Sequence, residues 1–340
     1  MTFDIYAAYR AHLTDDQMSP PLAGILALAE MIKNSDAGTM FELTKELKDA
    51  AEALKKQATN PIGLSAGCDL FVAFTTLFPH DSAQSFSDLR NQLVQHGEKY
   101  VEEALTYRQK IAQLSLAFIK DDSIILTHSY SRVVMQTLLH AHQTKRISVY
   151  VTEARPRGLG VKTYENLTSA GIPCTIVLDS AVAYVMDKVD FCLVGSEAVV
   201  ESGGLINAVG SNQIAVIAKA ANKPFYALAE SYKFHRSFPL NTYDLPTHTE
   251  TTLALPRPMQ RPMGLTARPS VMPRKNVPPS ETATPNSVVD FTPTTMSIEQ
   301  MSRNPQVDYT RPDLISLVFS DVGSLTPEGV SQYLVGMFAG

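Results

Sequence analysis

Apolar residues recur at helical spacing through the first part of the chain. Residues 39–58, TMFELTKELKDAAEALKKQA, predict an amphipathic helix whose buried face holds Leu43, Leu47, Ala50 and Leu54. Its first turn fits a capping box, with the Thr39 hydroxyl at the N-cap and the Glu42 carboxylate three residues later. Residues 85–120 predict one long helix, weakened only by Gly97.

From residue 123 onward the pattern changes to short apolar runs that alternate with helical stretches. The runs predict strands at residues 123–127, 146–151, 174–178, 190–194, 225–229 and 314–319. Because these runs are continuously apolar and alternate with helices, they indicate a parallel sheet covered on both faces. We therefore expect an α/β protein with an N-terminal all-helical domain, residues 1–120, followed by a Rossmann-like parallel-sheet domain, residues 121–340.

Residues 246–306 break this pattern and hold eleven of the chain's 21 prolines. Proline lacks the backbone N–H that a helix or a central strand needs, so neither is expected here. We expect a flexible insertion between the fifth and sixth strands that contributes little to folding. A docking motif in polyproline II conformation is the alternative.

The composition excludes several classes of protein. The chain has 340 residues, of which 44% are hydrophobic, enough for a large core. A net charge of −5 disfavours nonspecific binding to nucleic acid or acidic membranes. The chain has no basic and apolar leader at its start and no run of about 18 apolar residues. We expect a cytosolic protein whose partners include neither nucleic acid nor membrane.

The three cysteines, Cys68, Cys174 and Cys192, lie in apolar runs without a CxxC pair. They are expected to be reduced thiols in the core. The eight histidines show no HxxxH or HExxH spacing, so no metal site is predicted.

Polar residues gather where the predicted strands end. In an open α/β sheet, ligands bind at the carboxyl ends of the strands, so we expect these side chains to converge. The candidates are Thr127, His128, Ser129, Arg155, Arg157, Lys162, Asp179, Glu197, Glu201, Asn207 and His235.

Two sets of residues in these segments favour binding of an anion. Arg155 and Arg157, with Lys162, can clamp a phosphate or can pair with nearby carboxylates. The adjacent Gly203 and Gly204 can cradle an anion with their N–H groups or can form a tight turn. No GxGxxG or GxxxxGK[ST] motif occurs, so no nucleotide cofactor is predicted. Serine hydrolysis by His128 and Ser129 is not expected, because neighbouring strand residues point in different directions and no GxSxG elbow occurs.

Several segments together resemble a known family. ILTHSYSRVV, VYVTEARPRG, VGSEAVVESGGLINAVGSNQIAVIAKAANKPFY and FPLN are similar to the alpha/beta/delta subunits of eukaryotic translation initiation factor 2B. The later segment VDYTRPDLISLVFSDVGSLTPEGVSQYL resembles the alpha type most. The resemblance covers nearly the whole chain apart from the proline-rich segment. That family is in turn similar to isomerases acting on methylthioribose-1-phosphate and ribose-1,5-bisphosphate.

The resemblance implies a pocket without the isomerase reaction. Ser129 stands where those enzymes have a catalytic cysteine, and Glu197 where they have a catalytic aspartate. Gly203 and Asn207 are kept, while Ala208 replaces a lysine. No catalytic residue and no cofactor is therefore expected, although a sugar phosphate or nucleoside monophosphate is expected to bind weakly. The expected ligand-binding residues are Thr127, His128, Ser129, Arg155, Arg157, Glu197, Gly203, Gly204 and Asn207.

The resemblance also implies a function. It predicts a regulatory subunit of the guanine-nucleotide exchange factor for initiation factor 2, which dimerises and assembles with beta, gamma, delta and epsilon subunits. The N-terminal helices are expected to sense the phosphorylated alpha subunit of initiation factor 2 through Thr39, Glu42 and Phe71. The simpler interpretations are helix capping for the first two and core packing for Phe71. The alternative function is a sugar-phosphate aldose-ketose isomerase.

Overall fold

The computed structural model describes residues 3–58, 61–79, 85–255 and 296–338. The chain forms two compact units: residues 1–249 together with 305–340, and residues 250–304. The first unit holds the N-terminal helices and both sheets. Most of the predicted insertion, residues 256–295, lies outside the described residues.

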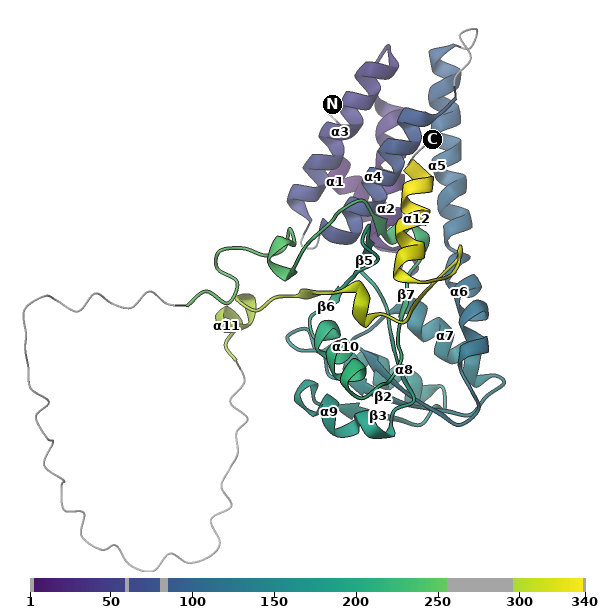
Figure 1. The fold of residues 1–340 in the computed structure, drawn as a ribbon. Helices are drawn as coiled ribbons and strands as arrows, with labels where there is room; N and C mark the ends of the chain where they lie inside the picture. Colours follow the sequence, from purple (N-terminus) through teal and green to yellow (C-terminus); the bar gives the residue numbers. More distant parts are fainter. Residues whose placement is uncertain (1–2, 59–60, 80–84, 256–295, 339–340) are drawn as a thin grey trace, which may run out of the picture. The chain divides into compact units, whose positions relative to one another are not determined.

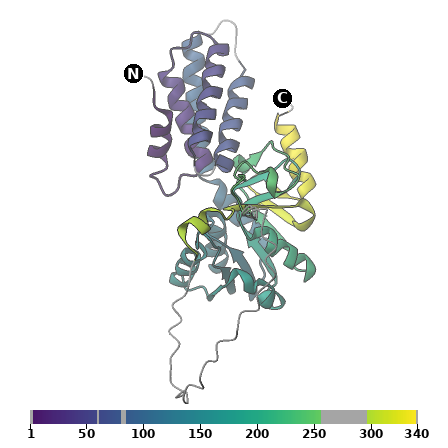
Figure 2. The same ribbon diagram turned by 90° about the vertical axis from the view of Figure 1, so that its left-hand side faces the viewer.

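The chain begins with packed helices, as predicted (Figures 1 and 2). They are α1 (Ile5–His12), α2 (Pro20–Asn34), α3 (Met40–Gln57), α4 (Pro61–Leu77) and α5 (Phe86–Ala104). Helix α2 is the central one: Leu22, Leu28 and Ile32 are fully buried. Its neighbours α1, α3, α4 and α5 all pack against it, because α2 is apolar on most of its surface.

The prediction of one long helix over residues 85–120 was wrong. Helix α5 ends at Ala104, and α6 (Tyr107–Ser115) and the 3₁₀ turn η1 (Leu116–Phe118) follow. At the break, the Thr106 hydroxyl and backbone N–H both donate to the carbonyl of Glu103, at 2.7 and 2.9 Å. Threonine competes in this way with regular helical bonding, and α6 packs with the sheet domain instead.

The main sheet has seven strands in the order β11-β10-β7-β4-β1-β2-β3. Their bounds are β1 (Ser123–His128), β2 (Ile147–Thr152), β3 (Cys174–Val177), β4 (Phe191–Val194), β7 (Phe225–Leu228), β10 (Leu317–Ser320) and β11 (Gly323–Leu325). All pairs are parallel except β10 with β11. The six predicted strands are confirmed, although the last begins at Leu317 because residues 312–314 form a 3₁₀ turn.

Helices cover both faces of this sheet. Alternate strand residues face opposite sides, so Ile125 packs toward α6, α7 (Arg132–His142) and α8 (Gly160–Ser169). Its neighbour Leu126 packs toward α9 (Val182–Val185), α10 (Ser211–Ala220) and α12 (Pro327–Phe338). The Rossmann-like parallel-sheet domain is confirmed.

A second, smaller sheet was not predicted. Its order is β8-β5-β6-β9, with bounds β5 (Ala198–Val200), β6 (Leu205–Ala208), β8 (Phe234–His235) and β9 (Val307–Thr310). The segment after β4 forms a hairpin of β5 and β6, packed on Ile62 and Leu245. The strands are short, and β9 follows the proline-rich segment, so no local pattern revealed their pairing.

The second unit contains α11 (Ile298–Ser302), although no helix was expected in residues 246–306. Ser297 and Gln300 form a capping box that starts it.

Cys68 and Cys192 are buried free thiols, and Cys174 is half-buried. Burial raises the pKa of Cys68 and of Cys192 to about 12, so both are inert at neutral pH. In the part of the chain that the structure describes, no helix is long and apolar enough to cross a membrane.

Candidate functional site

A crevice of about 630 Å³ lies at the carboxyl ends of β1 and β4. The strand order reverses here. Strands β2 and β3 lie on one side of β1, whereas β4, β7 and β10 lie on its other side. Open α/β sheets bind ligands at such a switch point. The lining residues are Leu13, Asp15, Asp16, Gln17, Met18, Pro20, His128, Ser129, Tyr130, Ser131, Arg132, Val133, Arg157, Leu159, Lys162, Ser196, Glu197, Asn207, Ala208, Glu230 and Lys233.

His128, at the end of β1, is held in one tautomer. Its Nε2 lies 2.9 Å from the carbonyl oxygen of Val209, which can only accept, so Nε2 carries the proton. Its Nδ1 lies 2.5 Å from the Thr152 hydroxyl and accepts from it. Burial lowers the pKa of His128, which keeps the ring neutral. Both nitrogens are occupied, so His128 is not placed to activate Ser129.

Ser129 follows directly and has a left-handed backbone with φ of 60°. Non-glycine residues adopt this conformation rarely, and they do so more often at functional sites. The Thr163 hydroxyl supports it by donating to the Ser129 carbonyl oxygen at 2.6 Å. Thr127 is buried within β1 and does not line the crevice.

Only two of the three predicted basic residues reach the crevice. Arg157 lies 3.6 Å from the Glu197 carboxylate, and the Lys162 ammonium lies 4.3 Å from the centre of the Tyr130 ring. Arg155 pairs instead with Glu153 at 3.6 Å and does not line the cavity.

Gly203 and Gly204 form the tight turn between β5 and β6, and they do not line the crevice. The Gly203 N–H donates to the Val200 carbonyl at 2.8 Å, with φ of 81° at Gly203. A Cβ at Gly203 would overlap Pro327, and one at Gly204 would overlap Tyr309. Their glycine identity therefore serves close packing rather than an anion cradle at this site.

Of the remaining candidate residues, one lines the crevice and three do not. Asn207 lines the crevice, and its side-chain amide donates to the Ser211 hydroxyl at 3.0 Å. The other three do not line the crevice and have partners elsewhere, namely Asp179 with the Arg155 backbone, Glu201 with Arg236, and His235 with Asp69. Among the described residues, no group of three His, Cys, Asp or Glu side chains could hold a metal ion.

Sequence reasoning missed Arg132, which lies in the first turn of α7. Its guanidinium donates to the backbone carbonyls of Asp16 and Met18 at 2.8 and 2.7 Å. It has no carboxylate partner among the described residues. Burial lowers its pKa, but arginine remains charged at neutral pH. A half-buried cation with spare donors is suited to an anion.

Glu230 and Lys233 were also missed, although they lie directly after the strand β7. Glu230 is fully buried and lies 2.8 Å from the Lys233 ammonium and 3.1 Å from the Arg108 guanidinium. Burial alone would raise the pKa of Glu230, but Lys233 and Arg108 outweigh it and lower the value to about 2. Arg108 also binds Gln17, so this network joins α6, the loop after α1 and the crevice.

The proposed sensing residues do not form one surface. Thr39 caps α3 by accepting from the Glu42 N–H at 3.2 Å. The Glu42 carboxylate accepts from the Gly38 N–H at 2.9 Å rather than from Thr39, so the predicted capping box is only half formed. Thr39 and Glu42 are exposed, whereas Phe71 is 3% exposed and belongs to the helical core.

Packed helices followed by a Rossmann-like parallel sheet, with a charged crevice at its switch point, define an α/β protein with an N-terminal helical region. Comparison with known families is more specific. The chain belongs to the Initiation factor 2 subunit family, whose model matches residues 14–327.

Relatives of two kinds are similar to the chain. It is 37% identical over 326 residues to "Translation initiation factor eIF2B subunit alpha" of Dictyostelium discoideum, covering 95% of this chain and 93% of that one. The protein of the same name in Caenorhabditis elegans is 33% identical, with 98% of each chain covered. "Ribose 1,5-bisphosphate isomerase" of Archaeoglobus fulgidus is 32% identical, with 61% of this chain and 64% of that one covered.

Solved structures share the fold. The Pyrococcus horikoshii OT3 translation initiation factor eIF-2B has a TM-score of 0.63 at 18% identity, with 95% and 97% of the two chains covered. A chain of the tetrameric eIF2B-beta2-delta2 complex from C. thermophilum has a TM-score of 0.68 at 17% identity, with 98% and 92% covered.

Proposed function

We propose that the chain is a regulatory subunit of translation initiation factor 2B, in the place of the alpha subunit. The observation that carries this proposal is the similarity, over nearly the full length of both chains, to two proteins named as that subunit. In this role it would help to inhibit nucleotide exchange when the alpha subunit of initiation factor 2 is phosphorylated. We expect it to act in the cytosol.

The chemistry of the crevice supports a non-catalytic role. Ser129 offers a hydroxyl where the related isomerases are expected to have a thiol, and a hydroxyl is far less easily deprotonated. His128 is neutral and fully hydrogen-bonded, so it does not supply the missing base. The Glu197 carboxylate lies 3.6 Å from the Arg157 guanidinium, and an ion pair of this kind makes a carboxylate a weaker base.

The second candidate function is a sugar-phosphate isomerase. It is favoured by the similarity to ribose-1,5-bisphosphate isomerases and by the crevice, whose lining includes both Asn207 and Ser129. An assay of the purified chain with ribose-1,5-bisphosphate and methylthioribose-1-phosphate distinguishes the two. The regulatory proposal expects no turnover above background, and a specific turnover that Ser129→Ala abolishes would favour the enzyme.

We propose that the crevice binds a sugar phosphate or nucleoside monophosphate as a regulatory ligand. Arg132 and Lys162 lie there without carboxylate partners, and guanidinium groups suit phosphate oxygens. Asp15 and Asp16 are exposed at the mouth, where they would disfavour a highly charged anion. Calorimetry with a panel of such monophosphates tests this, and no heat at millimolar concentration would contradict it.

The partners follow from the same proposal. We expect a homodimer that joins beta, gamma, delta and epsilon subunits, with phosphorylated initiation factor 2 contacting the start of α3. The surface there supports this contact: Thr39 and Glu42 are exposed and Phe41 between them is 81% exposed. Phe71 is buried, so we assign it to packing.

Affinity purification of the chain from its native cell tests the assembly. The expected result is stoichiometric recovery of four further subunits, with two copies of this chain by light scattering. Recovery of the chain alone, as a monomer, would contradict the proposal.

A further inference from the structure

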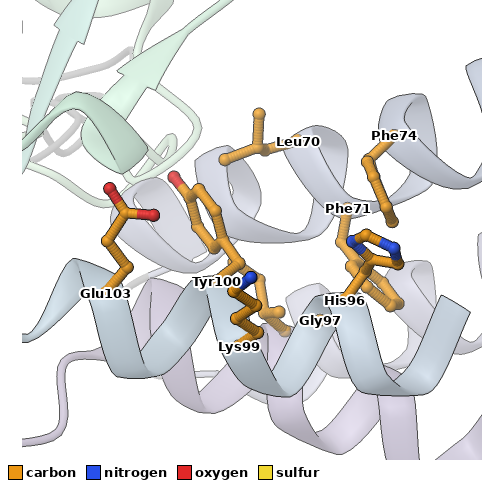
Figure 3. A pocket seen from close by; sticks show the side chains of 9 residues that line it. Leu70, Phe71, Phe74, His96, Gly97, Lys99, Tyr100 and Glu103 are labelled. Carbon is orange, nitrogen blue, oxygen red and sulfur yellow. The ribbon is translucent and has the colours of Figure 1, made fainter. Parts of the chain in front are cut away.

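A second cavity lies within the N-terminal helices, apart from the crevice at the sheet. It occupies about 280 Å³ between α4 and α5, with one residue from α2. Figure 3 shows the side chains of His96 and Tyr100 extending from α5 with Leu70 of α4 above the space between them. The lining residues are Ile25, Leu70, Phe71, Phe74, His96, Gly97, Lys99, Tyr100 and Glu103.

The wall formed by α4 is apolar and aromatic. Phe71 and Phe74 stack with ring centres 6.2 Å apart, and Phe74 lies 6.1 Å from the His96 ring. Gly97 allows the Phe71 ring to approach α5, since a Cβ there would lie 2.9 Å from a ring carbon. Flat walls of this kind favour an aromatic ring, which gains from edge-to-face and offset contacts.

The wall formed by α5 carries polar side chains, of which His96 and Lys99 are exposed and His96 and Tyr100 make ring contacts with Phe74 and Tyr107. His96, Lys99 and Tyr100 make no hydrogen bond or ion pair with any residue that the structure describes. Burial, with help from Tyr107, raises the pKa of Tyr100, so its hydroxyl remains a donor. The Lys99 ammonium can only donate. Glu103, the one acid in the lining, is already 3.6 Å from Lys110.

We propose that this cavity binds a small planar aromatic acid, with the ring between Phe74 and Tyr100 and the carboxylate at Lys99. Apolar pockets with a few converging polar groups are the usual form of small-ligand sites. The volume limits the ligand to one or two fused rings. The Lys99 cation and the Tyr100 hydroxyl match one carboxylate rather than a phosphate, which arginine forks suit better.

The test uses 2-naphthoate as the probe and 2-naphthamide as its neutral counterpart, titrated into the full chain by ligand-detected NMR. We expect a dissociation constant on the order of 0.1 mM for the acid, as a ligand of this size allows. The amide should bind about tenfold more weakly, since it loses the ion pair. No saturable binding of the acid up to about 5 mM, or equal affinity of acid and amide, would overturn the proposal.

Two variants and one control variant locate the site. Lys99→Gln should weaken binding of the acid about tenfold without affecting binding of the amide. The control is Lys45→Gln, which changes another exposed lysine, in α3, and should affect neither affinity. Leu70→Trp should fill the cavity and abolish both, with folding checked by circular dichroism. Naphthoate binding that is unchanged in Lys99→Gln would place the probe elsewhere and would refute the assignment, even if Leu70→Trp fails to fold. A negative result at this cavity does not affect the separate proposal that the crevice at the sheet binds a phosphorylated ligand.

Discussion

Replacing Glu230 with glutamine should destabilise the protein strongly at neutral pH and much less in acid. Glu230 is 1% exposed and pairs with Lys233 and Arg108, and the Tyr232 hydroxyl donates to it at 3.0 Å. Burial opposes its charge, but the two cations outweigh burial and lower the pKa from 4.5 to about 2. A difference of this size corresponds to about 3 kcal/mol of stability at pH 7.

The pH dependence has a defined sign. A carboxyl with a lowered pKa contributes stability that is present above about pH 4.5 and is lost as the pH falls toward 2. The wild type and Glu230→Gln should therefore differ by about 3 kcal/mol at pH 7, or roughly 4 °C in melting temperature for a chain of this length. The difference should shrink steadily through pH 4 and 3.

Urea titrations at pH 7, 5, 4 and 3 measure this difference. Glu201→Gln is the matched control, because Glu201 lies 3.9 Å from Arg236 in a more exposed pair that should contribute less than about 1 kcal/mol. Glu230→Gln would refute this expectation if its free energy of unfolding at pH 7 lay within about 1 kcal/mol of wild type, as the control is expected to do, or if its deficit grew as the pH falls.

Three further changes test other parts of the account. Arg132→Gln should weaken binding of sugar phosphates in calorimetry by about tenfold or more, and unchanged affinity would exclude it as the anion contact. Burial raises the pKa of Asp308 to about 7 despite N–H donors at Gly210 and Asn212, so the contribution of this carboxyl is present below about pH 4 and is lost as the pH rises through 7. Asp308→Asn should therefore melt higher relative to wild type at pH 8 than at pH 5, and a parallel pH profile would contradict this. Glu42→Lys should leave the melting temperature within about 2 °C, because its lost contacts are exposed, yet abolish inhibition by phosphorylated initiation factor 2. Retained inhibition in an assembled complex would move the sensor elsewhere.

The apolar periodicity of the sequence predicted those helices and strands that each carry their own periodic pattern. The helix over residues 39–58 and the six strands of the main sheet were predictable because each carries its own apolar periodicity. At the break, the Thr106 hydroxyl and backbone N–H both donate to the Glu103 carbonyl, and apolar spacing does not reveal such bonds. The second sheet depends on pairing β6 with β9 across the proline-rich segment, which no window of sequence reveals.

Part of the site could be predicted from the rule that ligands bind at the carboxyl ends of parallel strands. This rule correctly predicted that His128, Ser129 and Glu197 line one crevice. The rule did not distinguish Arg157, which turns into the crevice, from Arg155, which pairs outside it. Charges contributed by residues in a helix, such as Arg132, required the folded structure.

The central claim is that the chain is a regulatory subunit rather than an enzyme. The most direct measurement is release of labelled GDP from initiation factor 2, unphosphorylated and phosphorylated, by the four other subunits with and without this chain. We predict that adding the chain makes exchange sensitive to phosphorylation, while Ser129→Ala behaves as wild type. Equal inhibition by the phosphorylated substrate with and without the chain would contradict it.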